Sequence, residues 1–345
     1  MTQTAAFDVL GIPASPYTRK LLSLLRYRRI PHRFVHGVAR FVTDRPRSKV
    51  ALLPTAYLPN ADGGIEAVVD TTPIIRRLEA EHAGRAARPA DPVLALLDAL
   101  LEDYGDEWLT KAMFHYRWSY QADIDLSASI LPRMQQPRAA ENTLQDRGRE
   151  FAERQISRLY VVGSNPQTGP LIEESYRRFL ALFSRHLEDS AYLLGNRPAA
   201  SDFALFGQLT QLAQFDPTPM ALTLAEAPRV YAWTSMMEDL SGREVDESDW
   251  ISRNDVPASL KALLSEIGRV YVPVMLANAR ALRDGAESVT AEIDGQTWTQ
   301  QPFPYQGKCV QWLRQDYAAL SEADRQAVDG LLSGTGCEAL FAGAA

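Results

Sequence analysis

The sequence predicts an α+β fold in three consecutive parts: a small mixed N-terminal unit, a helical bundle, and a mixed helical and hairpin extension. Two observations lead to this prediction. Short apolar runs alternate with amphipathic helical patterns up to about residue 82, and helical periodicity then prevails from 93 to about 242. The 345 residues, of which 46% are hydrophobic and 23% charged, suffice for two ordinary folded domains.

The N-terminal unit begins with a strand and a well-capped helix. Phe7–Gly11 is a short apolar run that is typical of a buried strand. Ser15 fits a helix N-cap, and Pro16 fits the first helical position, where its missing N–H costs nothing. The expected order of elements is β-α-β-(α)-β-β-α. Further strands are expected at 32–37, 54–58 and 65–70, with an irregular basic segment at 38–53. The last helix of the unit is expected at 71–82, with Thr72 as its cap and Pro73 at its first position.

A Pro- and Arg-rich linker at 85–92 leads into the helical part. Its predicted helices are Val93–Tyr120, Leu144–Tyr160, Leu171–Leu187, Ser201–Phe215 and Pro228–Leu240, with the segment from Phe215 to Met220 as a loop. The extension is expected to contain the helices Ser259–Arg283, Tyr305–Leu320 and Ser321–Leu332, and a hairpin at Val289–Gln300 around Asp294-Gly295. We therefore place domains at 1–84, 93–245 and 246–345, with the linker between the first two.

The extension carries too many aromatic side chains for a free tail, so we expect it to pack on the core. These residues are Tyr271, Trp298, Phe303, Tyr305, Trp312 and Tyr317.

Composition excludes several classes of protein. A net charge of −7 argues against nucleic acid as a partner. Two cysteines cannot form a disulfide framework or a cysteine-rich zinc site, and no metal is expected. No apolar run is long enough for a membrane span, and the first residues lack the pattern of a signal peptide. We expect a soluble cytoplasmic protein without a membrane partner.

Four short motifs together resemble the serine-type members of the glutathione S-transferase superfamily. They are Ser15 at the start of the first helix, Pro54 ahead of a strand, Asp70-Thr71 before a helix, and Asp202 in "LLGNRPAASDFALF". The resemblance covers about residues 5–242 and rests on the order and spacing of the motifs. It implies a thioredoxin-like N-terminal domain followed by an all-α domain, whereas the extension has no counterpart in the minimal fold.

The resemblance also implies a glutathione site. Ser15 would donate a hydrogen bond to the glutathione thiolate at a helix N-terminus, where partial positive charge and free N–H groups favour an anion. Pro54 would be cis and would turn the backbone of Leu53 outward to pair with the cysteinyl part of the ligand. Asp70 would bind the γ-glutamyl ammonium, and Thr71 would bind the γ-glutamyl carboxylate.

Each of these assignments has a purely structural alternative. Ser15 could serve only as an N-cap, and Pro54 could be an ordinary loop proline. Thr71 or Thr72 could cap the helix while Asp70 complements its dipole. The glycyl carboxylate needs a cation from the basic segment, for which four residues stay open, with Lys49 favoured: Arg40, Arg45, Arg47 and Lys49.

Four residues of the first long helix share one face at helical spacing, and in this family that helix lines the second-substrate pocket. They are Tyr104, Trp108, Lys111 and His115. The alternative is core packing with a dimer contact. The acidic residues of the same helix are expected to form a solvated face: Asp98, Glu102, Asp103, Asp106 and Glu107. Cys309 is expected to be a small buried apolar residue.

The function expected from the resemblance is that of a glutathione transferase, with glutathione as co-substrate and a small electrophile as second substrate. Conjugation is the default reaction, and glutathione-dependent cleavage, dehalogenation or isomerisation would share its first step. Disulfide exchange is disfavoured because the Ser15 hydroxyl cannot form a mixed disulfide. The alternative is a non-catalytic scaffold of the same fold whose extension binds a partner. The family also implies a homodimer.

Overall fold

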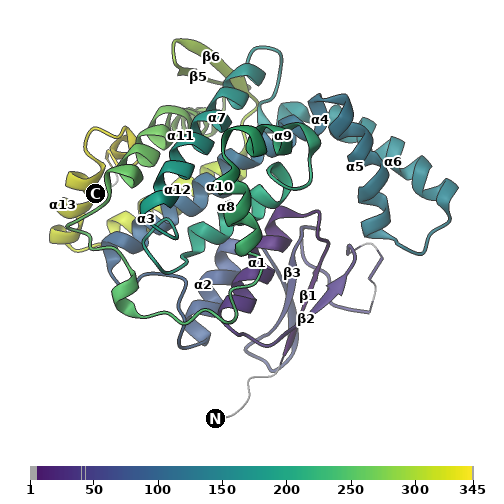
Figure 1. Ribbon diagram of the computed structural model, residues 1–345, viewed down its shortest axis with the longest axis horizontal. Coiled ribbons are helices and arrows are strands. Elements are labelled where there is room, and N and C mark those ends of the chain that lie inside the picture. Colours follow the sequence, from purple (N-terminus) through teal and green to yellow (C-terminus); the bar gives the residue numbers. More distant parts are fainter. Residues whose placement is uncertain (1–5, 40, 43, 344–345) are drawn as a thin grey trace.

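The computed structural model describes residues 6–39, 41–42 and 44–343. Its N-terminal part is built on a four-stranded sheet of order β2-β1-β3-β4 (Figure 1). The strands are β1 (Phe7–Gly11), β2 (His32–His36), β3 (Thr55–Pro59) and β4 (Ile65–Val69). β2 runs parallel to β1, and the pairs β1–β3 and β3–β4 are antiparallel. This is the predicted thioredoxin-like arrangement, followed by the predicted helical domain.

Helices α1 and α2 of this part begin at different kinds of cap. Helix α1 (Pro16–Tyr27) is capped by Ser15 with a proline at its first position, as predicted. Helix α2 (Thr71–Glu81) is capped by Asp70, so the prediction of Thr72 as its cap was wrong. The Asp70 side chain accepts a hydrogen bond from the Thr72 N–H, which starts the helix one residue before Thr72. Asp and Thr are both favoured N-cap residues, so a sequence that contains Asp70, Thr71 and Thr72 does not show which of them caps the helix.

One long predicted helix is interrupted in the structure. The segment expected as a helix at 93–120 consists of α3 (Pro92–Tyr104), a π-helical turn η1 (Gly105–Leu109) and α4 (Thr110–Ser119). The π-helical turn widens the helix at the position of its acidic and aromatic residues. Such turns are rare and often occur at functional sites.

Two helices were missed, α5 (Gln121–Gln135) and α9 (Pro217–Glu226). Pro132 and a weak apolar pattern hide α5, and the prolines at the start of α9 suggested a loop. The two helices are joined by buried Asp123, whose carboxylate accepts a hydrogen bond from the Thr218 N–H at 3.0 Å. The remaining helices of this part are α6 (Glu141–Ile156), η2 (Leu159–Val162), α7 (Gly169–Asp189), α8 (Ala200–Leu212) and α10 (Pro228–Met236).

The extension lies against the helical part and follows the predicted element order (Figure 1). The Asp294-Gly295 turn has positive φ at both residues, which is the geometry of a tight hairpin turn. Tyr271 and Trp298 are fully buried in the same apolar cluster that contains Phe7 of the first strand. The elements are η3 (Glu247–Asp249), α11 (Ala258–Asp284), β5 (Val289–Ile293), β6 (Gln296–Gln300), α12 (Pro304–Ala318), α13 (Glu322–Leu332) and η4 (Cys337–Leu340).

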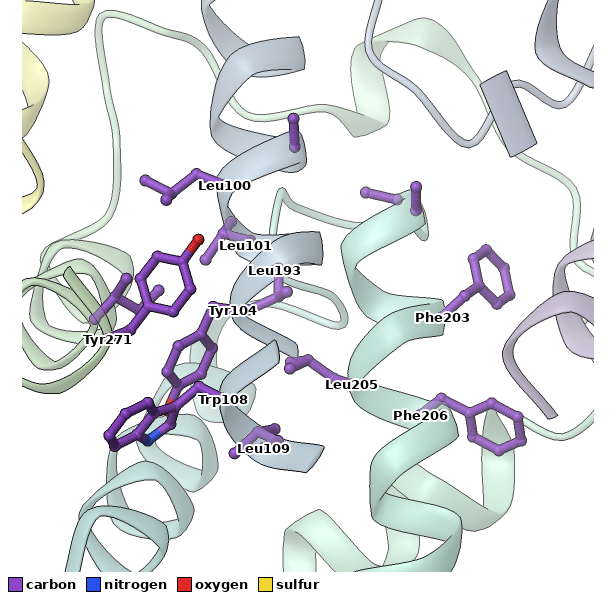
Figure 2. Packing of buried hydrophobic residues seen from close by; sticks show 14 of the residues in the cluster. Leu100, Leu101, Tyr104, Trp108, Leu109, Leu193, Phe203, Leu205, Phe206 and Tyr271 are labelled. Atoms are coloured by element: carbon purple, nitrogen blue, oxygen red, sulfur yellow. The ribbon is translucent and has the colours of Figure 1, made fainter. Parts of the chain in front are cut away.

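One apolar core therefore connects all three parts of the chain. Figure 2 shows Tyr104 and Trp108 on one side of α3 and η1, next to Tyr271 of α11, with Leu205 of α8 on the other side. A separate small cluster joins the loop after β1 to α4, α5 and α6. None of the helices in the described ranges is both long and apolar enough to cross a membrane.

Candidate functional site

The strand register brings three of the predicted motifs to one end of the sheet. Leu10 at the end of β1 pairs with Thr55 at the start of β3, and Thr55 pairs with Val69 at the end of β4. The residues that follow β1, precede β3 and follow β4 therefore share one edge. Ser15, Pro54 and Asp70 occupy these three positions.

Ser15 stands at the N-terminus of α1, half-buried, in extended backbone conformation. Its Oγ accepts a hydrogen bond from the Thr18 N–H at 3.2 Å, and its own N–H donates to the Ile12 carbonyl at 3.0 Å. A hydroxyl has one hydrogen to donate and two lone pairs. Since the cap uses only a lone pair, the hydroxyl hydrogen stays available, and no described residue accepts it. Capping and hydrogen bonding to a ligand are compatible for this side chain.

The peptide bond between Leu53 and Pro54 is cis, as the resemblance implies. Pro54 is buried and Leu53 is half-buried, with its side chain packed on the small cluster around Ile12 and Trp118. The Thr55 hydroxyl donates to the Leu52 carbonyl at 2.9 Å, and this hydrogen bond closes the turn that contains Leu53 and Pro54.

Asp70 combines a cap with a second contact that the sequence did not predict. Its backbone has a φ of 77°, which is unusual for a residue other than glycine. One carboxylate oxygen accepts from the Thr72 N–H at 3.3 Å, and the other accepts from the hydroxyl of Tyr305 at 2.9 Å. Burial raises the pKa of Asp70, against the opposing effect of the Tyr305 hydrogen bond and the charge of Lys20. Thr71, next to it, is buried.

Two family models match this chain. The model of the glutathione S-transferase N-terminal domain matches residues 9–86, and that of the C-terminal domain matches residues 143–234. The chain belongs to the glutathione S-transferase superfamily. The first match contains the strand ends that hold the three motifs. The second contains Asp202, which is fully buried and accepts hydrogen bonds from the N–H groups of Leu193 and Ala199.

Several solved glutathione transferases are similar to the chain at low identity. One from Methylobacterium radiotolerans, in complex with glutathione sulfonate, is 19% identical, with 70% of this chain and 99% of that chain covered and a TM-score of 0.39. One from Burkholderia graminis, with two glutathione molecules bound per subunit, is 14% identical, with coverages of 68% and 85% and a TM-score of 0.42. No curated protein matches the sequence.

The basic segment carries exposed cations at the surface of the N-terminal part. Lys49 is exposed and forms no ion pair with any described residue, and Arg47 is exposed as well. Arg45 is engaged elsewhere, because its guanidinium forms an ion pair with Asp8 at 2.6 Å. Arg40 lies outside the described residues. Lys49 therefore stays the prediction for the glycyl carboxylate.

The four residues predicted for the second-substrate pocket lie in the interior of this superfamily member. Tyr104, Trp108, Lys111 and His115 are only 2–6% exposed. The Trp108 indole donates to Ser175 at 3.1 Å, and the Lys111 ammonium donates to Gln300 at 3.1 Å. The His115 ring contacts Ser164 at 2.8 Å and Glu173 at 3.0 Å. The alternative of core packing accounts for these contacts.

A different face of α4 lies near the Ser15 loop. Trp118 belongs to the small cluster with Ile12 and Ala14, and Phe114 and Leu53 pack against this cluster. Sequence reasoning passed over Phe114 and Trp118 because periodicity identifies a shared face but not its neighbours. The spacing of four between them was the available signal.

The acidic residues of α3 and η1 are not a solvated face, and that expectation was wrong. Lys20 of α1 is fully buried and its ammonium forms ion pairs with Glu102 at 2.7 Å and Asp106 at 2.5 Å. The Thr72 hydroxyl also donates to Glu102 at 3.0 Å. Burial raises the pKa of Asp106 to about 7 and that of Glu107 to about 8. The compensating cation comes from a distant helix, so the local sequence gave no sign of burial.

A small cavity lies beside these carboxylates, between α3 and α12, with Thr72, Tyr305 and Cys309 in its wall. Cys309 is buried, as expected, and burial raises the pKa of its thiol. Within the described ranges, no group of three or more potential metal ligands is arranged to hold a metal ion.

Proposed function

We propose that the protein is a glutathione-dependent transferase that holds the thiolate of glutathione beside Ser15 and presents it to a small electrophile. The observation that supports this most is the strand register, which gathers Ser15, the cis Pro54 and Asp70 at one sheet edge. Two helix N-termini, those of α1 and α2, begin at the same edge. Helix N-termini favour anions, and glutathione carries a potential thiolate and two carboxylates.

The reactive step depends on the thiol. A free thiol has a pKa near 8.5, so most of it is protonated at neutral pH, and the thiolate is the nucleophile. The Ser15 hydroxyl would donate its unused hydrogen to the sulfur, while the α1 N-terminus adds partial positive charge. The thiolate then attacks an electrophilic carbon and forms a thioether as the leaving group departs with its electron pair. Cleavage, dehalogenation and isomerisation would share this first attack.

The rest of glutathione would be bound along the same edge. The backbone of Leu53 would pair with the cysteinyl unit, as an added strand does. Asp70 would take the γ-glutamyl ammonium, Thr71 the γ-glutamyl carboxylate, and Lys49 the glycyl carboxylate.

The second substrate would lie against the apolar side chains near Ser15. Phe114 and Leu53 border this region, and both are only partly buried. A wall of this composition favours a small apolar electrophile. The homodimer that the family implies stays a prediction.

Calorimetric titration with glutathione tests the proposal. The unsubstituted protein is expected to bind it, and Asp70→Asn is expected to bind about tenfold more weakly, because the ligand ammonium loses its negatively charged hydrogen-bond acceptor. Asparagine preserves the helix cap. Asp91→Asn is the matched control: Asp91 caps α3 through the N–H groups of Val93 and Leu94, outside the proposed site. Absence of binding up to millimolar glutathione would favour the scaffold alternative.

A further inference from the structure

We propose that the C-terminal extension supplies part of the glutathione site, with Tyr305 positioning Asp70 and Lys308 binding the γ-glutamyl carboxylate. This inference rests on the proposed function and adds residues that lie outside both matched family domains. It assigns to the extension a role in recognising the free amino-acid end of glutathione.

Tyr305 fixes the carboxylate that the N-terminal part offers. Its hydroxyl donates to one oxygen of Asp70 at 2.9 Å, while the Thr72 N–H donates to the other at 3.3 Å. Both oxygens are therefore held, and the side chain is confined to one orientation. Each carboxylate oxygen has a second lone pair, so Asp70 can still accept a hydrogen bond from a ligand ammonium.

Tyr305 is itself held in place by contacts within the extension. Its ring meets that of Trp312 edge-on, with centroids 6.3 Å apart. Phe303, two residues before Tyr305, is fixed to α11, because the Asn278 side chain donates to the Phe303 carbonyl at 2.9 Å and accepts from the Phe303 N–H at 2.7 Å. A site element held in this way needs little reordering when a ligand binds.

Helix α12 also contacts α2, the helix that Asp70 caps. The guanidinium of Arg76 on α2 contacts Asp316 on α12 at 2.5 Å and 3.3 Å through two nitrogens. A two-point contact of this kind fixes orientation as well as distance. The contact between α2 and α12 therefore fixes the position of Tyr305 relative to Asp70.

Lys308 provides a positive charge, opposite in sign to the Asp70 carboxylate, on the face of α12 that carries Tyr305. It follows Tyr305 by three residues, and side chains at this spacing are neighbours on a helix. It is exposed, its ammonium lies 4.2 Å from the Trp312 ring centroid, and no described acid forms an ion pair with it. Asp70 and Lys308 together match a zwitterionic amino-acid group, which carries both an ammonium and a carboxylate.

The test compares two ligands on the full-length protein. Glutathione has the γ-glutamyl group, and cysteinylglycine lacks it but keeps the thiol and the glycyl carboxylate. Tyr305→Phe is expected to weaken glutathione binding about tenfold in calorimetry and to leave cysteinylglycine binding unchanged. Lys308→Gln is expected to give the same selectivity with a smaller loss. A general loss of structure would lower the affinity for both ligands equally.

Tyr317→Phe is the matched control for the tyrosine. Tyr317 also lies on α12, and its hydroxyl donates to Asp329 at 2.9 Å, away from Asp70. It should leave the affinity for glutathione unchanged. Lys261→Gln, at an exposed lysine of α11, serves the same purpose for Lys308.

The outcomes separate the two proposals. If the unsubstituted protein binds glutathione and Tyr305→Phe binds it equally well or more tightly, the role of the extension is overturned and the proposed function stands. An equal loss of affinity for glutathione and cysteinylglycine in Tyr305→Phe would also overturn the role of the extension. If the unsubstituted protein binds no glutathione, the proposed function and this inference both fail.

Discussion

At the scale of single residues, the site region places hydroxyls and carboxylates in two roles at once. Ser15 caps α1 with a lone pair and keeps its hydrogen, and Asp70 caps α2 while its second oxygen receives Tyr305. The sequence predicted Ser15 as a cap because serine followed by proline marks a helix start. It could not predict the Tyr305 contact, since the two residues are 235 positions apart and no local pattern relates them.

The buried acids give a pH prediction at the same scale. Burial raises the pKa of Glu107 from 4.5 to about 8, and the charges of Asp103 and Asp106 act in the same direction. The folded protein therefore holds a proton that the unfolded chain has lost between about pH 4.5 and pH 8. Stability should fall as the pH rises through this window, by up to about 1.4 kcal/mol per pH unit for one proton.

Urea unfolding at pH 5.5 and pH 8 measures this effect. Glu107→Gln should show a smaller fall in the free energy of unfolding between the two pH values, because an amide does not ionise. Glu244→Gln is the control, since Glu244 is exposed and pairs with Arg29 at the surface. A free energy of unfolding that rises from pH 5.5 to pH 8 in the unsubstituted protein would contradict the assignment.

At the scale of elements, helices with a strong apolar face were predicted well, whereas α5, with its weak apolar pattern, and α9, whose first residues were assigned to a loop, were missed. Helix α11 and the hairpin of the extension follow the expected ranges closely. Helix α5 was missed because its buried residues include Asp123 and Ser127, which look like surface residues in sequence. The break of the 93–120 helix at η1 was also missed, since a π-helical turn has no distinct sequence period.

The hairpin of the extension should contribute to the stability of the whole core. Trp298 is completely buried, and its ring centroid lies 5.4 Å from that of Trp108 in η1. Trp298→Ala is expected to lower the free energy of unfolding by about 3–5 kcal/mol, as other large-to-small core changes do. Chemical denaturation followed by circular dichroism measures it.

Met236→Ala is the matched control, because Met236 is 64% exposed. It should change the free energy by less than about 0.5 kcal/mol. If both variants had equally small effects, the hairpin would be a peripheral attachment and the single-core description would be incorrect.

At the scale of the whole molecule, the strand register turns three separate motifs into one candidate site. The motifs could be found in the sequence because each marks the end of a local element. The residues that surround the candidate site could not be predicted from the sequence, because their positions depend on packing between helices that are distant in the chain. Tyr104, Trp108, Lys111 and His115 do share a helix face, but that face is buried against α7 and the extension.

The central claim is that Ser15 stabilises a glutathione thiolate, and ultraviolet titration of bound glutathione tests it most directly. The unsubstituted protein should lower the pKa of the bound thiol well below 8.5, and Ser15→Ala should raise it again by about one unit or more. Ser321→Ala controls for the lost cap, since Ser321 caps α13 through the Asp324 N–H at 3.1 Å, in the extension. A bound thiol that titrates identically in the unsubstituted protein and Ser15→Ala would contradict the account.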